Sequence, residues 1–308
     1  MVLVRGFNVK IGIIGVGHMG KEMALNLTKQ FELTAYDVDK KALENLKSGG
    51  VKVASSPKEV AEVSDVVVFS LPNDAIVEDV ILGKNGALQG AKAGSVFIDT
   101  STVSPRTTRK LAEIAEEKGV EYIDATCGGG PQQIREKKLV MWVGGKKDVV
   151  EGCRKVLEGI GCSSVVYMGE SGSGNTIKLI INTVAGTLTA ALAEIMVLAA
   201  KAGVDIPVFC NMLAPVWEWC WRRNTEHMTK RIFEPYQIRH FSTDLEYKDM
   251  ELGIRMAKDL KVPLILASNA QQLYEMARAE GLGKKDYTSV VLPLEKLAGV
   301  KVGQKTEN

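Results

Sequence analysis

Two hydrophobic patterns divide the chain. Up to about residue 170, short apolar runs without alternation are separated by stretches of helical period, which is typical of strands and helices alternating around a parallel sheet. We predict strands at 9–14, 33–36, 51–54, 65–71, 95–99, 121–125, 139–143 and 165–168, and helices at 21–29, 40–47, 57–62, 75–82, 106–118 and 149–160. The fold class predicted for this part is α/β, with a doubly wound Rossmann sheet.

Beyond residue 201, β-branched runs largely disappear and helical periods dominate. Helices are predicted at 207–213, 217–230, 244–260, 263–280 and 290–297. We therefore expect a dinucleotide-binding domain at 1–171 and an all-α domain at 172–308, concerned with substrate and oligomer contacts.

A proline-free run at 171–201 predicts one long helix joining the two domains. Between residues 176 and 200 it carries only two charges, Lys178 and Glu194, so we expect burial on nearly all sides. One polar stripe runs along it at spacings of three, four and seven: Asn175, Lys178, Asn182 and Thr189. A buried ammonium group needs a partner or a task. A membrane span is the less favoured interpretation, because polar residues interrupt the run.

The first predicted strand runs into a GxGxxG motif. Its glycines are Gly15, Gly17 and Gly20, with His18 and Met19 between them, and a helix and a second strand follow, ending at Asp37. Glycines allow a pyrophosphate to approach the helix N-terminus, and the carboxylate can bind the adenosine ribose. We assign no chemistry to the His18 side chain. NAD is favoured because Asp37 would repel a 2′-phosphate, and NADP stays possible because Lys40 and Lys41 lie close in sequence.

Composition narrows the function classes. The chain has 308 residues, 45% of them hydrophobic, and its net charge of +2 gives no indication of a nucleic-acid or membrane partner. Its five cysteines show no metal-ligand spacing, so we predict reduced thiols and no metal site. The N-terminus shows no cleavable signal pattern, and we expect a cytoplasmic protein.

Five motifs, in order, resemble those of the beta-hydroxyacid dehydrogenase family, which includes the 3-hydroxyisobutyrate dehydrogenases. Residues 15–20 are similar to its GxGxMG, and Leu71, Pro72 and Asn73 to its second cofactor loop. Residues 99–102 resemble its DxST, residues 124–130 its DAPVSGG and residues 172–182 its GxGxxxKxxxN. Lys248-Asp249 and residues 285–287 match signatures nearer the C-terminus.

The resemblance implies roles for individual residues. Lys178 would be the general acid/base and Asn182 would hold the substrate. A first-turn position and apolar neighbours should lower the pKa of the lysine. Substrate-binding residues would be Ser101, Thr102, Gly128, Gly129, Gly130 and Lys248; cofactor-binding residues would be those of the glycine motif with Asp37, Leu71, Pro72, Asn73, Thr102 and Lys248.

Departures from the family pattern leave the substrate open. Gly128 replaces a serine, Gln133 lies where small residues are usual, and 217–223 is rich in tryptophan and arginine. That last stretch is either core packing or a pocket wall.

We expect an NAD(P)-dependent oxidoreductase acting on a small 3-hydroxy acid of the 3-hydroxyisobutyrate, 3-hydroxypropionate, serine or glycerate type. Uncovered apolar helix surface predicts a homodimer or homotetramer. Two alternatives stay open: an imine reductase, a class that typically lacks the lysine, and a non-catalytic dinucleotide-binding protein.

Overall fold

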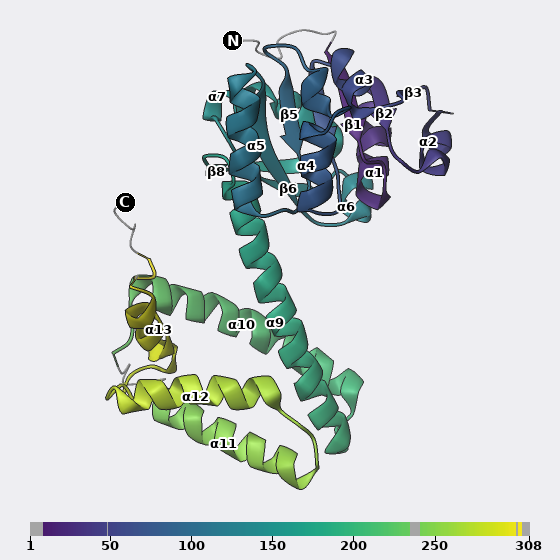
Figure 1. The fold of residues 1–308 in the computed structure, drawn as a ribbon. Coiled ribbons are helices and arrows are strands. Elements are labelled where there is room, and N and C mark those ends of the chain that lie inside the picture. Colours follow the sequence, from purple (N-terminus) through teal and green to yellow (C-terminus); the bar gives the residue numbers. More distant parts are fainter. Residues whose placement is uncertain (1–8, 48, 235–240, 300, 304–308) are drawn as a thin grey trace. The chain divides into compact units, whose positions relative to one another are not determined.

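The computed structural model describes residues 9–47, 49–234, 241–299 and 301–303 (Figure 1). Its contacts divide the chain into two compact units, Met1–Thr183 and Val184–Asn308. The division falls inside helix α9 (Ser173–Lys201), which is continuous. The boundary at 171/172 stays a prediction.

An eight-stranded sheet forms the centre of the N-terminal unit, in the order β3-β2-β1-β4-β5-β6-β7-β8. The strands are β1 (Lys10–Ile14), β2 (Glu32–Tyr36), β3 (Lys52–Val53), β4 (Val66–Phe69), β5 (Val96–Asp99), β6 (Glu121–Gly128), β7 (Leu139–Gly144) and β8 (Cys162–Gly169). All neighbours are parallel except β6 and β7, which are antiparallel. This confirms the predicted Rossmann-type α/β fold.

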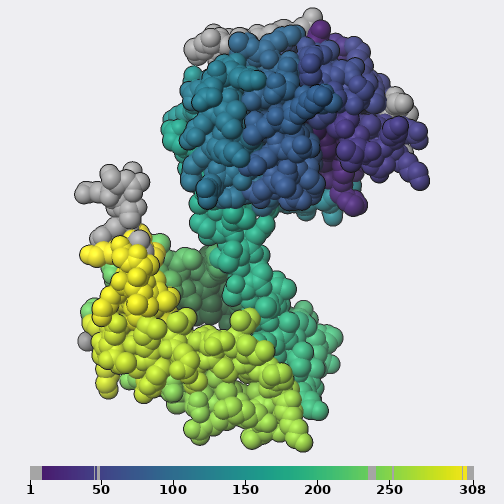
Figure 2. Space-filling view, viewed as in Figure 1, coloured from purple at the N-terminus to yellow at the C-terminus, as the bar shows by residue number. Residues whose placement is uncertain are grey.

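Helices cover both faces of the sheet. They are α1 (His18–Leu27), α2 (Lys40–Lys47), α3 (Pro57–Glu62), α4 (Asp74–Leu82), α5 (Pro105–Glu117), α6 (Pro131–Arg135), α7 (Lys147–Gly152) and α8 (Arg154–Ile160), with a 3-10 turn, η1, at Ala87–Gln89. Side chains of α3, α4 and α5 pack on one face, over which Figure 2 shows a continuous surface.

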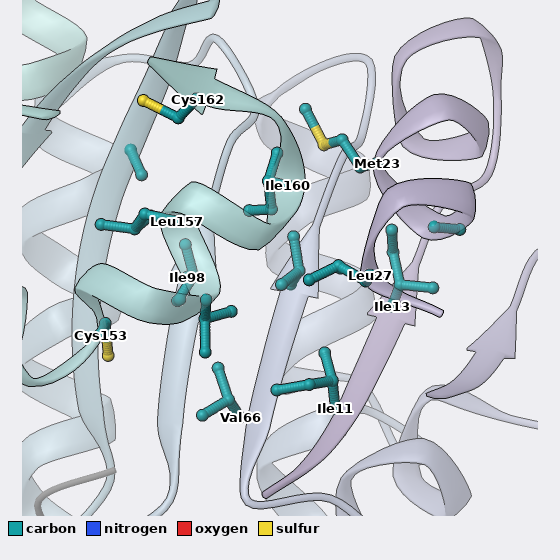
Figure 3. Close-up of a cluster of buried hydrophobic side chains, with 14 of the residues drawn as sticks. Ile11, Ile13, Met23, Leu27, Val66, Ile98, Cys153, Leu157, Ile160 and Cys162 are labelled. Atoms are coloured by element: carbon teal, nitrogen blue, oxygen red, sulfur yellow. The ribbon is translucent and has the colours of Figure 1, made fainter. Parts of the chain in front are cut away.

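The other face carries the larger apolar core. Met23 and Leu27 of α1 and Leu157 of α8 lie against Ile13 of β1 and Ile98 of β5 (Figure 3). The central strands are buried on both sides, which explains why their sequences are continuous apolar runs.

The C-terminal unit is helical. After α9 it contains α10 (Ile206–Lys230), α11 (Thr243–Asp259), α12 (Ile265–Ala279), a 3-10 turn, η2 (Tyr287–Val290), and α13 (Val291–Ala298). Its core is small and centres on Leu198 of α9, Ile254 and Ala257 of α11, and two residues before α12, Val262 and Leu264.

Several boundaries differ from those predicted. α10 is one helix that continues through Pro215, where we predict two. The predicted helix at 149–160 is two helices that meet at Cys153. β6 extends to Gly128 because it pairs with β7, a contact distant in sequence, and α6 is absent from the prediction.

The prediction that α9 is buried on nearly all sides is wrong for the chain by itself. Only 11% of its most apolar 18-residue window is buried, and Ile180 and Val197 are 54% and 56% exposed. The helix is long and apolar enough to cross a membrane, by length and composition only. That criterion is weak, since core helices of other proteins also meet it.

The tryptophan-rich stretch is not buried either. Trp217, Trp219 and Trp221 of α10 are each about half exposed in the chain, so the core-packing interpretation is wrong. Trp217 lines an apolar cavity of about 430 Å³ between α9 and α10, within the C-terminal unit. Arg223 stacks on Trp219 and Tyr287 and forms an ion pair with the buried Asp286.

Candidate active site

A cavity of about 490 Å³ opens at the carboxyl ends of β1, β2 and β4. It is lined by Ile14, Gly15, Gly17, His18, Met19, Tyr36, Asp37, Val38, Ser70, Leu71, Pro72, Ile76 and Val80. This is the edge at which ligands bind in doubly wound sheets.

The three motif glycines have different physical roles. Gly15 has φ of 89°, and a Cβ there would lie 2.3 Å from the Ser70 carbonyl oxygen. A Cβ on Gly20 would lie 2.0 Å from the Gly15 carbonyl oxygen, so α1 and the loop touch there. A Cβ on Gly17 would meet nothing within 4 Å. The first and third glycines allow the loop to lie close to Ser70 and to α1. Gly17 leaves the N-terminus of α1 open, as a pyrophosphate requires.

Asp37 is fixed at the end of β2. Its Oδ2 accepts the Val16 N–H at 2.7 Å and its Oδ1 accepts the Asp39 N–H at 2.8 Å. The carboxylate therefore joins the glycine loop to β2, and because Asp37 also lines the cavity, its remaining lone pairs can accept from ribose hydroxyls. These residues fit a dinucleotide.

A second cavity, of about 360 Å³, adjoins the first and shares four of its lining residues: Met19, Ser70, Leu71 and Pro72. Its other lining residues are Met23, Thr100, Ser101, Thr102, Cys127, Gly129, Lys178 and Asn182. All of them belong to the N-terminal unit. The fold thus brings the predicted catalytic pair to the same cavity as Ser101, Thr102 and Gly129.

Lys178 projects from α9 toward the end of β6. Its Nζ donates to the Cys127 carbonyl oxygen at 2.7 Å. α9 begins at Ser173, so Lys178 lies in its second turn. The predicted first-turn position is wrong. The field of a helix terminus falls off within the first turn, so the helix dipole acts less on this amine than that prediction supposes.

Two buried residues fix the start of α9. The Asp124 carboxylate of β6 accepts the Gly172 N–H at 2.9 Å and the Asn175 N–H at 2.8 Å. The Asn175 amide accepts the Val103 N–H at 2.9 Å and donates to the Thr108 hydroxyl at 3.1 Å. Asn175 shares the polar stripe with Lys178, but it joins α9 to the loop after β5 and does not line the cavity.

Burial raises the pKa of Asp124 from 3.8 to about 6, although the Gly172 and Asn175 N–H groups act in the opposite direction. Burial likewise raises the pKa of Asp99, which accepts the Tyr122 hydroxyl at 2.8 Å. Asp99 also accepts the Ser101 N–H at 2.9 Å, and the Ser101 hydroxyl accepts the Leu71 N–H at 2.9 Å. These bonds hold Ser101 and the Leu71 loop together at the wall shared by the two cavities.

Several predicted site residues lie outside these cavities. Asn73 caps α4 by accepting the Ile76 N–H at 3.0 Å. The N–H of Gly130, predicted to bind a substrate carboxylate, donates to Gln133 Oε1 at 2.9 Å. Gly128 lies against Trp142 of β7, and a Cβ there would be 2.6 Å from the indole. None of these three residues is among those that line the two cavities.

Lys248 belongs to the C-terminal unit, in α11, where its amine pairs with Asp249 at 2.9 Å. Its contact with the cofactor and substrate stays a prediction. Among the residues that the structure describes, no three His, Cys, Asp or Glu side chains form a group that could hold a metal ion.

Two family models together match most of the chain. Residues 10–169 match the NAD-binding domain of 6-phosphogluconate dehydrogenase, and residues 172–294 match the NAD-binding domain of NADP-dependent 3-hydroxyisobutyrate dehydrogenase. The chain is 35% identical to 2-(hydroxymethyl)glutarate dehydrogenase of Eubacterium barkeri, over 96% of this chain and 98% of that one. It is also 35% identical to the mitochondrial 3-hydroxyisobutyrate dehydrogenase of Mus musculus, over 91% and 85% of the two chains.

An imine reductase from Myxococcus stipitatus, solved with NAD+, has a similar fold. It superposes with a TM-score of 0.84, covering 93% of this chain and 99% of that one, at 17% identity. At this identity the likeness concerns the fold alone.

Proposed function

The chain belongs to the 3-hydroxyisobutyrate dehydrogenase family of NAD(P)-dependent hydroxyacid dehydrogenases, and from this premise we propose that it interconverts a small 3-hydroxy acid and its semialdehyde or 3-oxo acid. Candidate substrates are 3-hydroxyisobutyrate, 3-hydroxypropionate, serine and glycerate. The observation that carries the proposal is the cavity in which Lys178 and Asn182 meet Ser101, Thr102 and Gly129, next to the dinucleotide cavity. Its volume of about 360 Å³ is near the lower end for ligand pockets, about 300–1,000 Å³, which favours a short substrate.

The bound nicotinamide dinucleotide supplies the hydride acceptor or donor. In the oxidative direction, Lys178 in its neutral form takes the proton of the substrate hydroxyl, and in the reductive direction its ammonium returns that proton to the carbonyl oxygen. Asn182, one helical turn further on, orients the hydroxyl or carboxylate. The Cys127 carbonyl holds the amine at the cavity wall.

NAD is the cofactor we propose. Both oxygens of Asp37 accept backbone N–H groups, so the carboxylate is held in the cavity and a 2′-phosphate would meet its charge. Lys40 and Lys41 begin α2 nearby and are exposed, and they are the groups through which NADP could still bind.

Lys178→Met and Lys178→Ala test the proposal. Oxidation of the four acids would be measured with NAD and with NADP at high pH, and NADH binding by fluorescence. We expect kcat to fall by about 10²–10⁴-fold, the usual contribution of a general acid/base, while the NADH dissociation constant is unchanged. Activity retained in both variants would refute the role of Lys178.

The same assay separates the alternatives. Reduction of a cyclic imine without oxidation of any acid would indicate an imine reductase. Tight NADH binding with no turnover of either class would indicate a non-catalytic dinucleotide-binding protein. The lysine in the cavity favours the dehydrogenase over both.

We further propose a homodimer or homotetramer located in the cytoplasm. The exposed apolar side chains of α9 and α10, among them Ile180, Val197 and Met212, support a partner copy. Sedimentation equilibrium would give the subunit number, and a monomer across the accessible concentration range would refute this part of the proposal.

A further inference from the structure

Trp142 of β7 lies against the glycine-rich end of β6. β6 and β7 are antiparallel, with Thr126 opposite Trp142 and Gly128, opposite Val140, two pairs further along. A Cβ on Gly128 would lie 2.6 Å from Cη2 of the indole and 3.1 Å from both Cζ2 and Cζ3. A side chain at 128 and the indole in its present place are therefore mutually exclusive.

The same indole faces Lys178. Nζ of the lysine lies 5.9 Å from the ring centroid, within the range of a cation–π contact. The amine also donates a hydrogen bond to the Cys127 carbonyl oxygen, at 2.7 Å. Cys127 directly precedes Gly128, so the three contacts join β6, β7 and α9 at one point.

Core packing does not account for this tryptophan. Met141 and Val143, on either side of Trp142 in β7, are fully buried in the apolar core below the sheet. Trp142 points to the opposite face, as alternation along a strand requires, and is only half-buried. It also lies outside the residues that line the substrate cavity. The glycine and the amine both lie close to its ring.

We propose that Trp142 is a positioning residue for Lys178: its indole face and the Cys127 carbonyl hold the amine at the cavity wall, and Gly128 is required because it admits the ring. The inference rests on the proposed role of Lys178 in the reaction. It accounts for a glycine at 128 by the space that the ring needs.

Trp142→Phe, Trp142→Leu, Gly128→Ser and the double variant Gly128→Ser/Trp142→Leu test the inference. Phenylalanine keeps an aromatic face, and leucine, the matched control, keeps only apolar bulk. Turnover would be measured with the acids and cofactor that serve the unaltered protein best. We expect kcat to fall about tenfold in Trp142→Leu and about twofold in Trp142→Phe, with KM nearly constant.

The glycine variant extends the test to coupling. Gly128→Ser should reduce kcat about as much as Trp142→Leu, because the new Cβ displaces the ring. Since both changes remove the same contact, the double variant should be no worse than either single one. Independent, multiplying losses would overturn the inference, as would equal kcat values for the leucine and phenylalanine variants.

A chemical readout separates this inference from the proposed function. Labelling of Lys178 by trinitrobenzenesulfonate would be followed by peptide mass spectrometry, with the exposed Lys40 as internal control. We expect Lys178 to label several-fold faster in Trp142→Leu than in the unaltered protein or Trp142→Phe, whether or not a substrate has been found. Equal labelling rates in all three would overturn the inference, whereas an unaltered protein inactive on every acid would refute only the proposed reaction.

Discussion

Asp124→Asn tests how α9 is fixed to the sheet. Asp124 is fully buried, and each of its carboxylate oxygens accepts one N–H from the start of α9, those of Gly172 and Asn175. Asparagine keeps the shape but has a single acceptor oxygen, so one of the two N–H groups would face an NH2 group. An unsatisfied buried donor costs about 1–3 kcal/mol, and this cost is present at every pH.

A second, opposite effect depends on pH. The pKa of Asp124 is about 6 in the folded chain and 3.8 as the ordinary value, so between these values the folded state holds a proton that the unfolded state has released. The carboxyl therefore stabilises the fold less as pH rises, and the loss reaches about 3 kcal/mol above pH 6. About 2 kcal/mol of it falls between about pH 4.5 and 7.5. Asparagine has no such dependence.

We expect the difference in free energy of unfolding between Asp124→Asn and the unaltered chain to change with pH. At about pH 4.5 Asp124→Asn should be less stable than the unaltered chain, and by about pH 7.5 that difference should shrink by about 2 kcal/mol and vanish or reverse. Urea unfolding at fixed protein concentration would measure it, with Trp142 as the fluorescent probe in a background where Trp217, Trp219 and Trp221 are phenylalanine. A difference that is constant with pH, or that grows toward neutrality, would refute the assignment of a raised pKa to Asp124.

Three further predictions concern the two cavities and the loop that follows Gly129. Gly17→Ala should leave the melting temperature unchanged and weaken NADH binding at least about tenfold. Gly20→Ala should lower the melting temperature, because its Cβ would lie 2.0 Å from a carbonyl oxygen. Calorimetry and NADH titration would check both variants. Asp37→Asn should shift the ratio of kcat/KM values toward NADP, because it removes the charge that repels a 2′-phosphate, and an unchanged ratio would argue against the proposed cofactor choice. Gln133→Ala should release the Gly130 N–H and lower KM for acid substrates about threefold to tenfold; an unchanged KM would show that this N–H does not bind the carboxylate.

Much of the fold follows from local patterns in the sequence. The central strands are buried on both faces and therefore are apolar throughout, and the glycine motif follows the first of them directly. These features also locate the dinucleotide cavity, since Gly15, Gly17 and Asp37 act through local backbone geometry. The Rossmann-type fold and the nicotinamide cofactor could be predicted for this reason.

Contacts distant in sequence explain the errors. Pro215 predicts a break, but Cys210 and Leu213 before it and Trp217 after it line the same cavity with α9, so α10 packs on one neighbour along both sides of the proline. The extension of β6 to Gly128 depends on pairing with β7, which no local pattern reveals.

The same limit applies to the candidate site. The spacing of Lys178 and Asn182 places both on one helix face, and this is visible in the sequence. A glutamine three residues after a helix cap is a sequence signal for the bond between the Gly130 N–H and Gln133, but it can be used only once the short helix α6 is recognised. Trp142 gives no sequence signal, because its relation to Gly128 arises from strand register.

The position of the Lys178 amine depends on residues that take no part in the chemistry. α9 is mostly uncovered within the chain, so packing along its length cannot fix its rotation or its register on the sheet. The rotation and register of α9 are fixed at its start. There Asp124 holds the helix to β6, and Asn175 holds it to the loop that carries Ser101 and Thr102. Because β6 also supplies the carbonyl that binds the amine, the helix and the wall it faces are positioned by one strand. Changes at Asp124 should therefore affect kcat through the lysine and leave dinucleotide binding, which depends on β1 and β2, intact.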